Sequence, residues 1–304
     1  MKNIINYYYF FNSAELRKIE ENYIFRANNQ IFIFYKINQI DINNLMLVLK
    51  QTNNISYVHT PIYNRNKELV TFDGKDYYIM LKINIRQNRF IKVHDLFYLY
   101  NNVSVSEKHP NITFNWIELW SNKIDYLEYY INSKDSITDE VRCVFYYFIG
   151  LGENAINYLK NIFENTKTTG IDRISVVHKR ISYKDTLYDL YNPLNFVFDH
   201  ISRDISEYLK SVFWDGVYDL SIIENIIKNI NLSEFGYKLL FSRMIFPTFF
   251  FDLFDKYELN KFPVKELLDI YNRTKQYEEY ISLIYEIIKK TKNIDIPRIS
   301  WITN

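Results

Sequence analysis

The hydrophobic pattern of the chain changes its period near residue 89, and this change restricts the folds that the chain can adopt. Before that point, residues 31–37 are β-branched and aromatic, and a similar run at residues 75–83 follows the turn pair Asp73 and Gly74. Such runs predict strands, and the turn pair favours a hairpin. Residues 43–52 lie between the runs and have apolar side chains at helical spacing. The first 88 residues are therefore predicted to be mostly strand, with one helix inserted.

A helical period predominates beyond residue 89. One strand-like island, at residues 174–187 and 194–198, interrupts it. Ser202, Asp204 and Glu207 have the spacing of a capping box, which predicts where the next helix begins. Helices are predicted around residues 116–127, 155–163, 205–213, 222–230, 235–254, 264–271 and 277–290.

Composition limits the class of protein. The 304 residues suffice for one domain with two lobes, and the 48% hydrophobic content excludes disorder. The 37 basic and 36 acidic residues nearly cancel and are interleaved, so the basic stripe typical of nucleic-acid-binding proteins is missing. No apolar window approaches the roughly 18 residues that a membrane helix needs. The sequence therefore predicts a folded protein with no nucleic-acid partner and no membrane span.

Cysteine and histidine usage argues against disulfides and zinc. The single cysteine, Cys143, cannot form an internal disulfide, which favours a reducing cytoplasm or a fold that needs no disulfide. It lies in the apolar run at residues 141–149, so we expect a buried, inert thiol. The five histidines have no Cys or His partner at metal-ligand spacing, so no zinc centre is expected.

The order of elements indicates a fold class. A small β-rich lobe followed by a helical lobe, with a short hairpin-like interruption, is how protein kinases are built. The sequence therefore predicts an α+β, protein-kinase-like two-lobed fold. Its small β-rich N-terminal lobe is expected at residues 1–88, and its larger, mainly helical C-terminal lobe at residues 89–304.

The hairpin-like interruption carries the spacing of a kinase catalytic loop. Such a loop has a His-x-Asp string with an Asn five residues after the Asp, and a metal-binding Asp follows in a nearby strand. Here His178 begins the string, Arg180 stands at the position of the base, Asp185 replaces the Asn, and Asp199 follows. We predict that His178, Arg180 and Asp185 are degenerate positions and that the chain has no catalytic residue.

The nucleotide-binding features are also missing or weak. No glycine precedes Gly74, so the early strands cannot form the Gly-rich loop that lets backbone amides approach phosphates. Lys36 is the one counterpart of the phosphate-binding lysine, yet residues 37–67 contain no Glu and only one acid, Asp41, to pair with it. Lys36 is thus either a residual nucleotide contact or an ordinary strand lysine.

Four acidic residues allow two interpretations each, with Asp185 and Asp189 taken together. Asp199 is a metal ligand by position, or a structural acid that pairs with His200, Arg203 or loop amides. Asp204 is a helix N-cap, or an acid that fixes the backbone of the loop. Asp185, together with Asp189, either holds a cation or is solvated.

Several stretches of the chain form recognisable motifs. They are Trp116-Ile-Glu-Leu-Trp120, Phe148-Ile-Gly-Leu-Gly-Glu-Asn-Ala-Ile-Asn-Tyr158, Val177-His-Lys-Arg-Ile181, Phe198-Asp-His-Ile-Ser-Arg-Asp-Ile-Ser-Glu-Tyr208, Leu240-Phe-Ser-Arg-Met-Ile-Phe-Pro247 and Ile299-Ser-Trp-Ile302. In these motifs the chain resembles one family, the YutH-type endospore coat-associated proteins, and the resemblance spans nearly the whole chain.

The resemblance implies a sporulating bacterium and a fold similar to the CotS group and to aminoglycoside and choline phosphotransferases. With the degenerate positions, it leads us to expect a non-catalytic, pseudokinase-like scaffold in the spore coat, made in the mother-cell cytoplasm, with other spore coat proteins as partners and no cofactor. The alternatives are a divergent small-molecule phosphotransferase and a nucleotide-binding pseudokinase, for which ATP and magnesium would be ligands.

A protein that works by being bound should expose an apolar patch of a few hundred Å². The aromatic excess offers two candidates. One is the helix predicted at residues 235–254, and the other is the group of tyrosines in residues 1–11.

Overall fold

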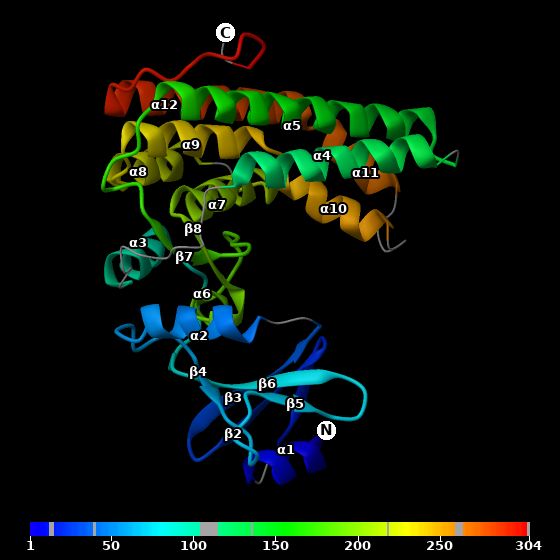
Figure 1. Cartoon of the computed structure of the whole chain (residues 1–304), viewed down its shortest axis with the longest axis vertical. Coiled ribbons are helices and arrows are strands. Elements are labelled where there is room, and N and C mark those ends of the chain that lie inside the picture. The colour runs from blue at the N-terminus through cyan, green and yellow to red at the C-terminus, as the bar shows by residue number, and fades with distance from the viewer. Residues whose placement is uncertain are drawn as a thin grey trace. The chain divides into compact units, whose positions relative to one another are not determined.

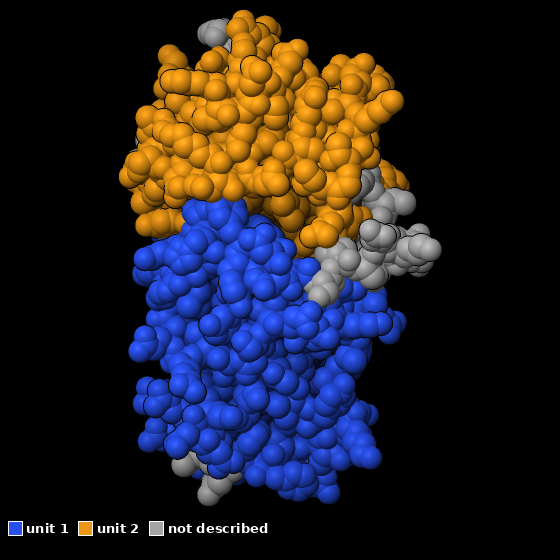
Figure 2. Space-filling model, turned by 90° about the vertical axis from the view of Figure 1, so that its left-hand side faces the viewer, with its two compact units in different colours: residues 1–106, 184–198 blue, residues 107–183, 199–304 orange. Residues whose placement is uncertain are grey.

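The computed structural model describes residues 1–11, 15–38, 41–103, 115–134, 136–217, 219–258 and 264–302. The chain forms two compact units, which are described separately below (Figure 2). Unit 1 comprises residues 1–106 and 184–198, and unit 2 comprises residues 107–183 and 199–304. The lobe boundary predicted at residue 88 stays a prediction, and unit 1 runs past it to Ser106.

Unit 1 is built on an antiparallel sheet with the strand order β1-β2-β3-β6-β4, and β5 also pairs with β6 (Figure 1). The strand runs predicted at residues 31–37 and 75–83 are confirmed as β3 and β6, and the helix predicted at residues 43–52 as α2. The elements are α1 (Lys2–Tyr9), β1 (Arg17–Ile19), β2 (Asn22–Ala27), β3 (Gln30–Ile37), α2 (Ile42–Gln51), β4 (Thr60–Ile62), β5 (Val70–Phe72), β6 (Tyr77–Ile83), α3 (Val93–Asn102), α6 (Leu187–Leu190) and the 3₁₀ turn η1 (Pro193–Asn195).

The two faces of this sheet are covered by different helices because side chains alternate along each strand. Phe32 and Phe34 of β3 pack against α1, where Ile5 and Tyr9 are buried. The alternate residues of β3, including Tyr35, pack on the other face with α2 and Leu194. Every odd-numbered residue of β3 therefore faces α2, and every even-numbered residue faces away from it.

The first element of unit 1 differs from the prediction. Residues 1–88 were expected to begin with strands, but α1 occupies Lys2–Tyr9. Its aromatic residues favour strands locally. The helix forms because Ile5 and Tyr9, one turn apart, both bury themselves against the sheet, and the Tyr9 hydroxyl bonds to Thr71 Oγ1 at 2.8 Å. Tertiary packing thus overrides local propensity.

Unit 2 is a set of packed helices with α5 lying against α4, α9 and α11 (Figure 1). α7 packs against α9, and α12 packs against α8 and α9. The elements are α4 (Trp116–Ser133), α5 (Asp139–Asn165), β7 (Ile174–His178), α7 (Ser202–Trp214), α8 (Leu220–Asn229), α9 (Glu234–Ile245), α10 (Thr248–Glu258), α11 (Val264–Tyr271) and α12 (Thr274–Lys292).

Three predictions in the helical part need correction. The strand predicted through residue 187 ends at His178, where β7 pairs with β8 (Phe196–His200). The helix predicted at residues 235–254 is two helices, because Pro247 lacks an N–H and holds Phe246 in an extended conformation. Cys143 is exposed, not buried, because it lies on the outer face of α5.

The two predicted apolar patches differ in how much of each is exposed to solvent. α9 is almost entirely buried, so it offers no docking surface. Among the N-terminal tyrosines, Tyr7 is 57% exposed, whereas Tyr9 is buried in the core of unit 1. Only part of the predicted tyrosine patch is therefore on the surface.

Candidate functional site

The catalytic-loop string begins at the end of β7, where Asp204 of α7 holds His178. The His178 backbone N–H donates to Asp204 Oδ1 at 2.8 Å, and His178 Nδ1 lies 2.5 Å from Asp204 Oδ2. Both side chains are buried. The capping box predicted with Asp204 is wrong, since the N-cap of α7 is Ile201 and no side chain caps it. Asp204 instead fixes the backbone of the loop, which was the second interpretation.

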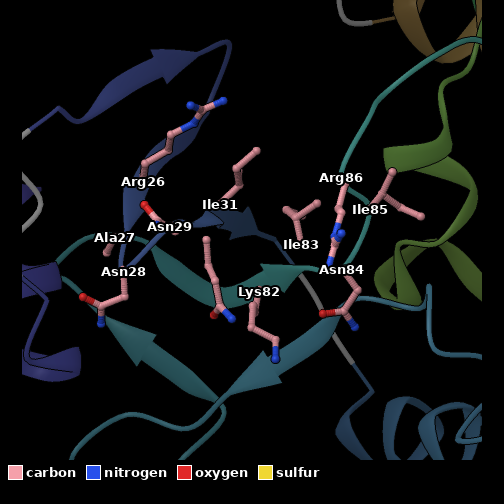
Figure 3. Close-up of a pocket in the computed structure, with 11 residues that line it drawn as sticks. Arg26, Ala27, Asn28, Asn29, Ile31, Lys82, Ile83, Asn84, Ile85 and Arg86 are labelled. Atoms are coloured by element: carbon pink, nitrogen blue, oxygen red, sulfur yellow. The ribbon is translucent and has the colours of Figure 1, made fainter.

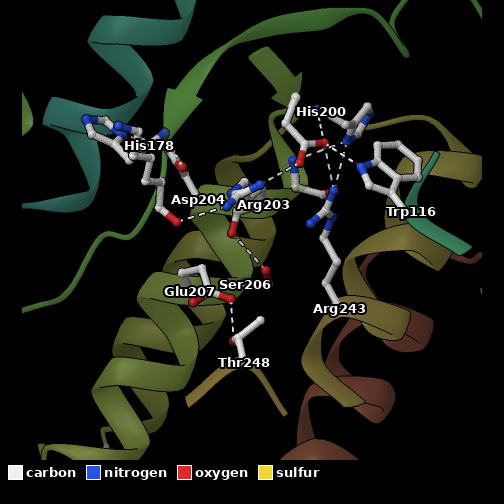
Figure 4. A network of polar contacts seen from close by, with 12 residues as sticks. Trp116, His178, His200, Arg203, Asp204, Ser206, Glu207, Arg243 and Thr248 are labelled. Carbon is white, nitrogen blue, oxygen red and sulfur yellow. Dashed lines mark hydrogen bonds and ion pairs between the residues drawn. The ribbon is translucent and has the colours of Figure 1, made fainter. Parts of the chain in front are cut away.

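Asp199 lies in β8 and receives hydrogen bonds on both carboxylate oxygens. Three of the donor residues, Trp116, Arg203 and Arg243, are labelled in Figure 4. Its Oδ1 accepts from Trp116 Nε1 at 2.9 Å, from Arg243 at 2.7 Å and from the His200 backbone N–H at 2.6 Å. Its Oδ2 accepts from Arg203 at 3.0 Å. We call the group of Asp199, Trp116, Arg203 and Arg243 the arginine clamp.

The arginine clamp keeps Asp199 ionised. Burial by itself would raise the pKa of this carboxyl, but the charges of Arg243 and Arg203 outweigh it and hold the pKa below its usual value. The Arg243 guanidinium lies 4.8 Å from the ring centroid of Trp116 and 5.9 Å from that of Trp120. Cation–π contacts of this kind favour a buried guanidinium. The clamp therefore supplies Asp199 with its counter-charges and its side-chain hydrogen-bond donors from within unit 2.

Arg180, at the position of a kinase base, forms its main ion pair with α10. Its Nε lies 2.7 Å from Asp252 Oδ2, and a second nitrogen donates to Asp252 Oδ1 at 2.8 Å. Glu207 lies further away, at 3.9 Å. The loop around Arg180 also lies beside Asp199, as the spacing predicts, because Arg203 donates to both Asp199 and the Lys179 carbonyl.

Lys36 leaves the sheet on the face opposite to α2. Lys36 is separated from Phe32 and Phe34 by an even number of residues along β3, so its side chain lies on the same face of the sheet, which α1 covers. Its ammonium lies 3.2 Å from Asp76 and 3.7 Å from Glu21, and these contacts raise its pKa, with the Asp76 hydrogen bond as the main cause. The search for a carboxylate partner in residues 37–67 missed both acids, because they lie in hairpin turns outside that stretch.

Asp185 belongs to unit 1, whereas Arg180 and Asp199 belong to unit 2. The Asp185 carbonyl accepts a hydrogen bond from the Ile91 N–H at 2.9 Å. Asp189 caps α6 by accepting from the Thr186 N–H and hydroxyl. Within the described ranges, no three His, Cys, Asp or Glu side chains are arranged to hold a metal ion.

Sequence reasoning placed Trp116 and Arg243 in matching motifs but assigned neither a role. Each is far from Asp199 along the chain, by 83 and 44 residues respectively. No spacing rule connects such distant positions. The position of Arg243 among the apolar residues of the C-terminal part of α9, Leu239–Ile245, is a signal that could have pointed to a buried partner.

Comparison with solved structures shows the class of fold. An aminoglycoside phosphotransferase from Alicyclobacillus acidocaldarius aligns with a TM-score of 0.62, at 9% identity and with 97% of both chains covered. The AMP-bound spectinomycin phosphotransferase aligns with a TM-score of 0.59 at 11% identity, covering 93% of this chain and 96% of that one. The predicted kinase-like fold, with a small β-rich part and a larger helical part, is confirmed.

The family model described as "Spore coat putative kinase YutH" matches residues 2–284, and the chain belongs to this family. The endospore coat-associated protein YutH of Bacillus subtilis (strain 168) is 29% identical over 208 residues. That match covers 62% of this chain and 61% of the relative's length. The resemblance found in the sequence motifs is thus confirmed. No helix in the described residues is long and apolar enough to cross a membrane.

Proposed function

We propose that the protein is a non-catalytic, pseudokinase-like component of the endospore coat that serves as a structural or interaction scaffold. It is synthesised in the mother-cell cytoplasm and then joins the coat, where its partners are other coat proteins. The name of the Bacillus subtilis relative and the family description support the coat location.

The arginine clamp is the observation that carries this proposal. A kinase needs the carboxylate at this position to hold magnesium between the β- and γ-phosphates. Magnesium binds through oxygen ligands with free lone pairs in near-octahedral geometry. Here the two oxygens of Asp199 accept four hydrogen bonds, two of them from guanidinium groups. A magnesium ion would have to displace these donors and lie beside two positive charges.

The nucleotide side of the fold supports the same proposal. In a kinase, the Gly-rich loop covers the phosphates and a strand lysine pairs with them. In this chain, two acids, Glu20 and Glu21, form the turn between β1 and β2. Lys36 is engaged by Asp76 and Glu21. Lys36 is thus already paired with carboxylates, which makes it less available to a phosphate group.

The test is an assay of turnover on protein shown by a cooperative thermal melt to be folded. With magnesium and ATP or GTP, we expect no phosphate release or transfer above that of a boiled sample, and no rise in melting temperature. Magnesium-dependent turnover that Asp185→Ala abolishes, and that the exposed-surface control Glu153→Ala retains, would overturn the proposal.

A second experiment tests the scaffold role by measuring how much of a variant protein enters the coat of sporulating cells. We expect Asp185→Ala protein to enter the coat at the wild-type level and to support a normal coat. A coat defect in cells where the variant is present at its normal level would show that the chemistry of this position matters, contrary to the proposal.

A further inference from the structure

One end of the sheet in unit 1 carries a hollow of about 770 Å³ (Figure 3). The turn between β2 and β3 forms one wall, and the segment that follows β6 forms the other. Three cationic side chains, Arg26, Lys82 and Arg86, line it, and no carboxylate does. We call this set of three residues the basic rim.

The basic rim has no internal counter-charge. In the part of the chain that the structure describes, no ion pair involves Arg26, Lys82 or Arg86. At the opposite end of the same sheet, by contrast, Lys36 is held by Asp76 and Glu21. Uncompensated cations around a concave surface focus a positive potential there and attract anions.

The register of the sheet determines how this charge is distributed. Arg26 pairs with Ile31, on the face that α2 covers, while Lys82 pairs with Phe32, on the face that α1 covers. Figure 3 accordingly shows Arg26 and Lys82 extending in opposite directions. A single small anion cannot reach both groups, whereas an extended chain with several negative charges can pass around the end of the sheet.

The remaining lining indicates what kind of extended anion fits. Ile31, which is half-buried, lies between the cations, so an apolar side chain has a surface to contact. No aromatic side chain lines this hollow, so it lacks the stacking platform on which single-stranded nucleic acids bind. A second hollow of about 430 Å³ shares Arg26 and Ile31 with the first and adds Arg17 and Glu15, whose charged groups lie 4.0 Å apart. The uncompensated positive charge therefore belongs to the first hollow.

We propose that the basic rim binds an extended segment of a partner protein in which acidic residues alternate with apolar ones. This inference rests on the proposed scaffold function, because it specifies the chemistry of the scaffold's partner. Acidic side chains pair with Arg26, Lys82 and Arg86, and an apolar side chain between them contacts Ile31.

The test measures binding of a short, dye-labelled peptide of alternating Glu and Leu, without magnesium or nucleotide. Arg26→Glu/Arg86→Glu is the test variant. Lys2→Glu/Lys75→Glu is its control, since it changes the net charge equally at exposed positions of unit 1 outside the hollow. We expect binding about tenfold weaker in the test variant only, because each reversal replaces attraction with repulsion. Added salt should weaken wild-type binding.

Equal affinity in the two variants, or tight binding of a matched Lys–Leu peptide, would overturn the proposal. Competition by ATP, inorganic triphosphate or an oligonucleotide at the affinity of the peptide would also overturn it, in favour of a phosphate ligand. Thermal melts of both variants check that the exposed substitutions leave the fold intact. Peptide binding is independent of turnover, so failure of this proposal and failure of the non-catalytic assignment are distinguishable.

Discussion

Replacing Asp199 with Asn should destabilise unit 2 strongly. The substitution removes the negative charge that compensates two guanidinium groups, and the side chain of Arg243 is only 7% exposed. Removing one partner of a buried ion pair costs about 3–5 kcal/mol, since it leaves an uncompensated buried charge. For a chain of this size, each kcal/mol lowers the melting temperature by about 2 °C or more. We therefore expect a fall of roughly 6–15 °C in thermal unfolding followed by circular dichroism.

Two further variants make the measurement decisive. Asp252→Asn breaks the ion pair with Arg180, in which both side chains are about 40% exposed, so it should cost only about 0–1 kcal/mol. Asp199→Asn combined with Arg243→Met removes both members of one buried pair and should recover part of the loss. If Asp199→Asn melted within a degree of the wild type, the carboxylate would not be the centre of a structural clamp, and the reasoning would be refuted.

Three other substitutions test separate features. Gly152→Ala should destabilise the fold by about 1–3 kcal/mol, because the added Cβ would overlap Ile124 Cδ1. Gly150→Ala, which has open space around it in the same helix, should stabilise the fold by about 0.5–1 kcal/mol. Chemical denaturation measures both free energies of unfolding. Burial alone would raise the pKa of Glu207, but Lys210 and Arg180 lower it to about 2. The lowered pKa of Glu207 in the folded state stabilises the fold above about pH 4.5, and this stabilisation is lost as the pH falls from about 4.5 to 2. Glu207→Gln should therefore flatten the dependence of the free energy of unfolding on pH in that window. An unchanged slope would contradict the assignment. Tyr9→Phe should cost about 1 kcal/mol through its lost bond to Thr71, while Tyr7→Ser, at an exposed site, should leave the melting temperature unchanged; equal effects would contradict the packing of α1.

The sequence predicted the sheet of unit 1 well where local and tertiary preferences agree. β3 has apolar residues on both faces because α1 and α2 cover the two sides, so its strand signal was continuous. The sequence-based prediction was wrong for α1, where tertiary packing determines the structure. The tyrosines of α1 favour a strand locally, but burial of Ile5 and Tyr9 against the sheet stabilises a helix. The break at Pro247 was visible in the sequence, since a residue before proline avoids the helical conformation.

The candidate site was predictable in its loops but not in its partners. The spacing of His178, Arg180 and Asp199 placed the loops together correctly, because strand pairing of β7 and β8 brings them side by side. The roles of Trp116 and Arg243 depend on how distant helices pack, which no local pattern encodes. The interpretation of Asp199 as a structural acid had named Arg203, and only the structure adds the second arginine.

The arginine clamp also limits how the sequence can change over generations. Replacing Asp199 alone leaves two guanidinium groups without their shared counter-charge, and such an unbalanced state is strongly destabilised. A lineage that regained a free carboxylate at position 199 would have to lose both arginines, and the loss of the second would leave the buried carboxylate without a counter-charge. The clamp thus stabilises Asp199 as an arginine-paired carboxylate, and single substitutions cannot readily return it to a free carboxylate.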